Sequence, residues 1–193
     1  QIKSGAQSAG KYISNSAAQG YHIIFKTDDT FDLYKVNNLL AAPSGCTNSQ
    51  SQTGWGTWSI KTSGSGNQTF VGNYPIPANG LIFVEDNLWV DGQINSARVT
   101  VISVVTQGDF NVGLSSSDTL RIDAALIAQN GRAGRYYYSS NCGSAYQRDT
   151  LTLYGMIGTN GRYGFAYTDG TGYETRNIIY DANLLYGPPP SFP

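Results

Sequence analysis

Short apolar runs separated by Gly, Asn and Asp follow one another along the chain from Tyr74 onward. They are the size of β-strands, as in "LIFVEDNLWVDGQINSARVTVISVV", "TLRIDAALIAQNG" and "TLTLYGMIGTNG". The piece "RIDAALIAQ" would also suit a helix, but the similar "TLYGMIGT" contains two glycines beside aromatic and apolar residues, which disfavour one. We therefore expect an all-β chain in which similar segments share a strand structure.

The region before Tyr74 has a different pattern. Residues 1–20 are small and polar and suit a short helix or a frayed arm. Residues 21–36 hold two β-rich runs on either side of Asp28-Asp29-Thr30, which predicts a β-hairpin. A loop-rich segment with a possible strand at 57–61 follows. We therefore divide the chain into a smaller N-terminal β-rich module, residues 1–73, and a second unit, residues 74–193.

Two segments of the second unit are near copies. Residues 118–134 read "DTLRIDAALIAQNGRAG" and residues 149–164 read "DTLTLYGMIGTNGRYG". The matched pairs are Leu120/Leu151 and Ile122/Leu153 at an offset of 31, then Ile127/Ile157, Asn130/Asn160, Gly131/Gly161 and Arg132/Arg162 at an offset of 30. A weaker copy, "NLWVDGQI", matches Leu88, Val90 and Asp91 to Leu120, Ile122 and Asp123 at an offset of 32.

A period near thirty with paired short strands is typical of a parallel β-solenoid, in which each coil buries the apolar stripe of the next. Gly131 and Gly161 would take positive φ, and stacked Asn130 and Asn160 would exchange amide hydrogen bonds. The N-terminal module would cap one end, and the tail with Pro188 would cross the other. The alternative is a β-sandwich with two similar hairpins, since Asn-Gly is also a common hairpin turn.

Composition narrows the classes of partner. Charged residues make up 13% of the chain and the net charge is −1, so there is no strong nucleic-acid signal. No apolar stretch approaches the roughly 20 residues that cross a bilayer. The opening "QIKSGAQSAG" is no signal peptide, and any export signal or anchor is expected upstream. Exposed thiols would be a liability in so polar a chain, so a Cys46–Cys142 disulfide and an exported location are favoured over free thiols.

The sequence offers little for catalysis or metal binding. His22 is the one histidine, inside an expected strand, and there is no nucleophile elbow, zinc set, phosphate loop or dinucleotide motif. Asp28, Asp29 and Asp32 lie close enough for a calcium site, although Asp is also common in hairpin turns. We therefore expect no cofactor and no metal.

Acidic residues keep one enzymatic alternative open. Polysaccharide lyases and hydrolases on β-helices need clustered acids on one face. Stacking would align Asp118 with Asp149, but such a pair also caps turns through side-chain-to-backbone hydrogen bonds. A non-enzymatic role is the main expectation.

Aromatic residues near the repeats suggest a binding surface. The runs "RYYYSS" and "RYGFAYTDGTGY" follow the two copies at equivalent places, so their aromatics would form one patch for glycans or protein partners. The alternative is that each tyrosine packs over the flank of the coils. The candidate binding residues are Arg135, Tyr136, Tyr137, Tyr138, Tyr163, Tyr167 and Tyr173.

Four quoted segments carry a family resemblance. "GLIFVEDNLWVDGQINSARVTVIS", "LRIDAALIAQNG", "LTLYGMIGTNGRYG" and "YDANLLYGPPPSFP" resemble, in that order, the C-terminal region of PilX-like, type IV pilus-associated bacterial surface proteins, and "YHIIFKTDDTFDLYKV" resembles a segment that precedes it. The resemblance covers residues 74–193 and implies a β-solenoid outside the cell, at or near a pilus, in a minor pilin-like or adhesin-like subunit. It implies no catalytic residues. The long apolar N-terminal helix of a pilin is not in this sequence.

Three functions remain open at this point. The first is a non-enzymatic extracellular module that displays loops for adhesion or subunit contact, with other pilus subunits, surface proteins or a glycan as partners. The second is a β-helix carbohydrate-active enzyme, and the third is a structural spacer. A row of acids in an open groove would favour the enzyme, and a surface with no concave or aromatic patch would favour the spacer.

Overall fold

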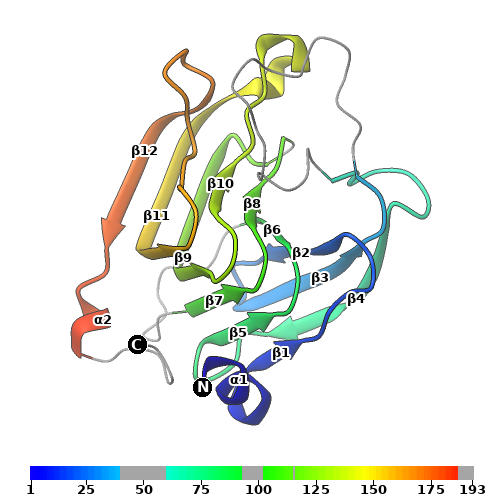
Figure 1. The fold of residues 1–193 in the computed structure, drawn as a ribbon, viewed down its shortest axis with the longest axis vertical. Helices are drawn as coiled ribbons and strands as arrows, with labels where there is room; N and C mark the ends of the chain where they lie inside the picture. Colours follow the sequence, from blue (N-terminus) through cyan, green and yellow to red (C-terminus); the bar gives the residue numbers. More distant parts are fainter. Residues whose placement is uncertain (40–59, 93–101, 115, 187–193) are drawn as a thin grey trace.

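The computed structural model describes residues 1–39, 60–92, 102–114 and 116–186. The described part of the chain is mostly β, with 50% strand and two short α-helices. Its strands form two sheets of six, one wholly parallel and one mixed (Figure 1). The expected all-β class is therefore confirmed at this level.

Sheet A is parallel throughout. Its order is β1 (Lys11–Ile13), β5 (Leu81–Val84), β7 (Ile102–Thr106), β9 (Thr119–Ala128), β11 (Gln147–Thr159) and β12 (Gly172–Tyr180). Every neighbouring pair in this order runs in the same direction. The strands lengthen along the sheet, from three residues in β1 to thirteen in β11.

Sheet B is mixed. Its order is β10 (Ala133–Arg135), β8 (Phe110–Val112), β6 (Leu88–Gly92), β2 (Gly20–Phe25), β3 (Thr30–Val36) and β4 (Gln68–Pro75). The first four strands are parallel, and β3 and β4 add to them in antiparallel fashion. The predicted hairpin at residues 21–36 is confirmed as β2 and β3, with Asp29 at a φ of 62° in the turn.

The chain passes from sheet A to sheet B four times, in the pairs β1–β2, β5–β6, β7–β8 and β9–β10. The offset in sequence between paired residues is 22 from β5 to β7 and again from β7 to β9, then 31 from β9 to β11 and 25 from β11 to β12. The expected period near thirty is therefore wrong for most of sheet A. The offset of 31 arises because the 3₁₀ turns η1 (Ser140–Cys142) and η2 (Ser144–Tyr146) are inserted before β11, and the offset of 71 from β1 to β5 includes β2, β3 and β4.

The register of β9 against β11 confirms the core of the sequence repeat. Leu120 lies beside Leu151 and Ile122 beside Leu153, as predicted. Ile157 lies beside Leu126 rather than Ile127, because the offset of 31 holds to the end of both strands. The second copy is one residue shorter than the first in the turn after the strand, where the Gly161 amide donates to the Gly131 carbonyl over 2.8 Å.

The predicted match of "NLWVDGQI" to the first copy of the repeat is wrong, because the two segments lie in different sheets. Leu88 and Val90 belong to β6 in sheet B, where they lie beside β2, whereas Leu120 and Ile122 belong to β9 in sheet A. Strands of either sheet show similar apolar alternation, because each sheet buries one face in the same interior.

One core lies between the two sheets. Sheet A contributes residues such as Ile82, Val104 and Leu120, and sheet B contributes residues such as Ile23 and Phe110. Alternate side chains face the other way: Leu81 and Phe83 of β5 pack against helix α1 (Ile2–Ala9) on the outer face of sheet A (Figure 1). Burial of the apolar side chains between the two sheets is the main stabilising contribution.

The division at residues 73 and 74 does not correspond to a boundary in the structure. It falls within β4, and β1 and β2 pair with β5 and β6 from the other side of it. The possible strand at residues 57–61 is reduced, in its described part, to an isolated bridge between Ile60 and Leu39. Helix α2 (Asn183–Tyr186) follows β12, and the prolines Pro188 to Pro190 lie outside the described residues.

Candidate functional site

Most of the predicted aromatic surface lies in the interior. Arg135 and Tyr173 have no exposed surface, and Tyr137 and Tyr138 are buried. Tyr136 and Tyr167 are half-buried. Tyr163, with 54% of its surface exposed, is the one member that solvent reaches freely. Seven residues that sequence spacing grouped as a recognition patch therefore serve mainly as packing between loops.

Arg135 is held by a ring of acceptors and aromatic faces. Its Nη1 donates to the Gly113 carbonyl and, over 2.7 Å, to Ser116 Oγ. Its Nη2 donates to the carbonyls of Ala145 at 2.7 Å and Leu114 at 3.3 Å. Burial lowers the pKa of the Arg135 guanidinium from its ordinary value. Carbonyl dipoles thus take the place of a carboxylate, and the side chain ties residues 113–116 to η2.

Aromatic rings complete this cluster. The Arg135 guanidinium carbon lies 4.8 Å from the ring centroid of Tyr138 and 5.6 Å from that of Tyr173. The Tyr173 hydroxyl lies 3.0 Å from Ser116 Oγ. Such stacking of a desolvated guanidinium stabilises the cluster. The role that these contacts support is structural.

Tyr137 and Tyr167 join the insertion before β11 to the loop before β12. The Tyr137 hydroxyl donates to Asp169 Oδ2 over 2.6 Å, and the Tyr167 hydroxyl donates to the Arg135 carbonyl over 2.9 Å. Their rings meet edge to face at 4.9 Å between centroids. The hydrogen bond to Asp169 raises the pKa of the Tyr137 hydroxyl, so it remains a donor at neutral pH.

Polar side chains at the corners between strands bind the backbone of the neighbouring corner. Asn87 Oδ1 accepts the amide of Asp109 at 3.0 Å, and Asp109 Oδ1 accepts the amide of Arg132 at 3.0 Å. At another corner, Asp118 Oδ1 accepts the amide of Asp149 at 3.2 Å, which confirms the predicted turn-capping role of this aligned pair. We call these three contacts the corner ladder. In each contact one side-chain oxygen, Oδ1, accepts a backbone amide.

The sequence analysis missed the first two members of this ladder. Asn87 and Asp109 each immediately precede a strand of sheet B, at an offset of 22 that equals the register offset between β6 and β8. That spacing was the available signal. It was hidden because the clearer repeat, with its offsets near thirty, contains the insertion before β11.

The predicted amide ladder of Asn130 and Asn160 is not formed. Both side chains are exposed, and neither side chain makes a hydrogen bond to another described residue. Gly131 and Gly161 also do not have positive φ. A Cβ on Gly131 would lie 2.2 Å from Asp109 Oδ1, and one on Gly161 would lie 3.1 Å from Arg132 Cβ. Close approach between neighbouring corners, rather than backbone conformation, requires glycine at position 131.

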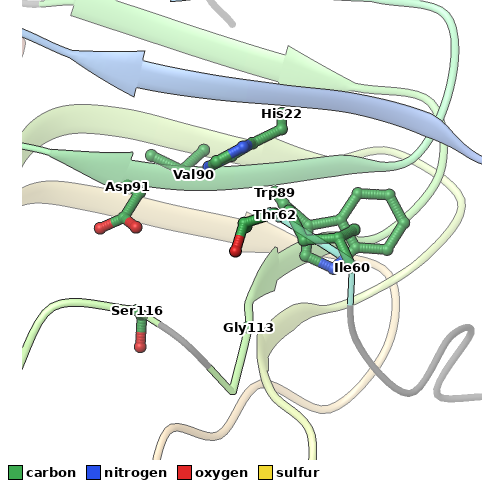
Figure 2. Close-up of a pocket in the computed structure, with 8 residues that line it drawn as sticks. All are labelled: His22, Ile60, Thr62, Trp89, Val90, Asp91, Gly113 and Ser116. Carbon is green, nitrogen blue, oxygen red and sulfur yellow. The ribbon is translucent and has the colours of Figure 1, made fainter. Parts of the chain in front are cut away.

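His22 lies beside a small cavity on the outer face of sheet B (Figure 2). The cavity is lined by His22, Ile60, Thr62, Trp89, Val90, Asp91, Gly113 and Ser116. His22 Nδ1 lies 3.3 Å from Gln68 Oε1, and burial lowers the pKa of its imidazole. The volume of about 20 Å³ gives room for about one or two water molecules, and a sugar ring does not fit.

The hairpin acids are occupied by local contacts. Asp28 Oδ1 accepts the Thr30 amide at 3.1 Å and the Thr30 hydroxyl at 2.7 Å, which is the arrangement of an Asx turn. Asp32 pairs with Lys26 at 2.8 Å. Among the described residues, no three His, Cys, Asp or Glu side chains come together as a metal site.

Cys142 is disulfide-bonded. Cys46, the predicted partner and the only other cysteine of the sequence, lies outside the described residues. In the part of the chain that the structure describes, no helix has the length and apolar character to cross a membrane.

One edge of the molecule, drawn in orange and red in Figure 1, carries five exposed large apolar residues of β12 and α2. We call it the β12 surface. Its apolar members are Ile178, Ile179, Tyr180, Leu185 and Tyr186, each with 45% to 90% of its surface exposed. The sequence analysis did not identify it, because an apolar run such as "NIIY" ordinarily indicates a buried strand.

No protein-family model matches this chain, and neither a curated protein nor a solved structure shows significant similarity to it.

Proposed function

We propose that the two sheets are the flanks of a short parallel β-solenoid. Parallel pairing of β9 with β11 supports this, because two similar hairpins in a sandwich would bring the copies together through antiparallel strands. Alternation of the chain between the sheets, with register offsets between 22 and 31 from β5 onward in sheet A, also supports stacked coils. Strands β3 and β4 extend sheet B beyond the coils.

We further propose that the protein is a non-enzymatic extracellular module of a type IV pilus-associated, minor pilin-like surface protein, which uses its exposed surface for adhesion or subunit contact. The observation that carries this is which polar side chains are engaged by the backbone and which apolar side chains are exposed. Asp109 is buried and accepts a backbone amide, and the exposed Asp118 accepts another, whereas five large apolar side chains are exposed on the β12 surface. An exposed apolar patch of this kind marks an interaction site.

The corner ladder argues against the enzymatic alternative. A polysaccharide lyase or hydrolase needs acids that face an open groove with free oxygens for proton transfer. Asp109 is buried and accepts the Arg132 amide, and the exposed Asp118 is held to the neighbouring corner through Oδ1, which accepts the Asp149 amide. The cavity beside His22 is too small for a sugar.

A role as a bacterial surface module agrees with the resemblance of residues 74–193 to PilX-like proteins and with a disulfide-bonded Cys142.

The test is a binding experiment with two arms. The purified chain is sedimented with pili from the organism that encodes it, and is screened in parallel on a glycan array. Retention on pili or a defined glycan would support the module, and Tyr163→Ala, at the exposed aromatic of the predicted patch, would weaken binding if that loop is the contact. Asn160→Ala, also exposed, is the matched control. Cleavage of an acidic polysaccharide by the chain would overturn the proposal.

A further inference from the structure

Strand β12 is an unpaired edge of sheet A. It pairs with β11 on one side; Gly172 and Tyr173 at its start also contact residues 165–166, and residues 174–180 pair with no other described strand. Residues 174–180 are all exposed, including Ile178, Ile179 and Tyr180. An exposed edge of this length presents a row of free backbone donors and acceptors, which invites pairing with another strand. Its apolar content adds a hydrophobic contribution to that pairing.

Two opposite charges stand on this edge without a charged partner among the described residues. Glu174 and Arg176 are two positions apart and therefore share one face of the strand. Arg176 Nη1 donates to the carbonyls of Tyr173 at 2.7 Å and Glu174 at 3.0 Å, which fixes the guanidinium over the strand. Its Nη2 and Nε, and the Glu174 carboxylate, are left for another molecule.

We propose that β12 pairs in antiparallel fashion with β12 of a second copy of this chain, about a twofold axis at Thr175. In this register Glu174 lies opposite Arg176 of the second copy, and Arg176 lies opposite Glu174 of the second copy. Two cross-strand ion pairs form, and sheet A becomes one sheet through both molecules. A parallel pairing in register would instead place like charges side by side.

The other sheet edges fit β12 less well. Strand β1, at the far edge of sheet A, has three residues, so head-to-tail pairing would leave most of β12 uncovered. Strand β4, the outer strand of sheet B, has eight residues and no charged side chain to meet Glu174 or Arg176. A second copy of β12 matches the charges, and the twofold register at Thr175 places residues 172–178 of the two strands opposite one another. The inference rests on the proposed function only in taking the β12 surface as a subunit contact.

Sedimentation equilibrium of the purified chain tests this pairing without pili or glycans, so its result is separate from that of the binding test above. We expect a dimer in the wild type. Glu174→Arg places two cationic pairs across the strands and should raise the dimer dissociation constant at least about tenfold. The swap Glu174→Arg with Arg176→Glu restores both pairs and should return the constant to within about threefold of the wild type.

Phe70→Glu on β4 is the matched control, because Phe70 is 55% exposed on the other edge. It should leave the dimer unchanged. The inference is overturned by a chain that stays monomeric up to about 1 mM, by a dimer indifferent to Glu174→Arg, by a swap that fails to restore it, or by a dimer that Phe70→Glu disrupts. All three positions are exposed, so the substitutions leave the core intact, and circular dichroism checks that each variant is folded.

Discussion

Asp118 and Asp149 begin the two copies of the repeat, and Oδ1 of Asp118 accepts the amide of Asp149 over 3.2 Å. The same relation joins Asp109 to Arg132 at another corner of the fold. In both, a short polar side chain at one corner satisfies a backbone group of the next. In the proposed solenoid, the ladder would fix the axial register of neighbouring coils, which apolar side chains alone specify less sharply.

The corner ladder should contribute to stability according to its burial. Asp109 is 8% exposed, so Asp109→Ala leaves the Arg132 amide unsatisfied in the interior and should lower the free energy of unfolding by about 1–3 kcal/mol. Asp118→Ala, at an exposed corner, should cost less than about 1 kcal/mol, because water replaces the carboxylate. Urea unfolding measures both.

Asp109→Asn and Asn160→Ala are the controls for this ladder. Asp109→Asn keeps the accepting oxygen and should recover most of the lost stability. Asn160 makes no side-chain hydrogen bond to a described residue, so Asn160→Ala should stay within about 0.5 kcal/mol of the wild type. A larger loss for Asn160→Ala than for Asp109→Ala would contradict the ladder as described.

Strand β11 contains two glycines with opposite expected tolerance. Gly155 has a φ of 152°, and a Cβ there would lie 2.0 Å from the Ala124 carbonyl oxygen of β9. Gly155→Ala should therefore destabilise the protein by about 2–4 kcal/mol. At Gly158 the nearest atom would lie 3.5 Å away, so Gly158→Ala should be close to neutral. Thermal unfolding of the two variants tests this difference in stability, and equal melting temperatures would contradict the close approach at Gly155.

The sequence predicts the strand content, the β2–β3 hairpin and the Leu120/Leu151 register, because each depends on local alternation or on a near-identical repeat. It does not predict the shorter offset of 22, because the segments that carry it, around Asn87 and Asp109, share only one polar residue before an apolar run. Burial of Arg135 was also hidden, since acceptors distant in sequence replace the solvent that an arginine normally requires.

Arg135 should be intolerant of conservative change. Lysine retains the charge but cannot reach the acceptors on both sides of the guanidinium or stack on Tyr138. Arg135→Lys should therefore lower the free energy of unfolding by about 3–5 kcal/mol, as when a buried charge loses its partners. Arg162→Lys, at an exposed position, should have little effect. The comparison is made by chemical denaturation, and similar midpoints for the two variants would show that the acceptors around Arg135 do not hold it.

His22 should make stability depend on pH in a defined direction. Burial lowers the pKa of its imidazole below the ordinary value of 6.5, with Gln68 and Asp91 acting against this. The unfolded chain therefore binds the proton more readily than the folded one. Stability from this group is full above about pH 6.5 and falls as the pH drops toward the folded-state pKa, by at most about 1.4 kcal/mol per unit.

The measurement is the free energy of unfolding of wild type and His22→Gln from about pH 7.5 to about pH 5, a range chosen to lie above the ordinary titration of carboxylates. We expect the wild type to lose stability over this range and the variant to lose less, because glutamine carries no titrating group. The control is the hairpin variant Asp28→Asn, which alters an exposed carboxylate and should keep the slope of the wild type. Parallel curves for wild type and His22→Gln would show that the imidazole is not buried in its neutral form.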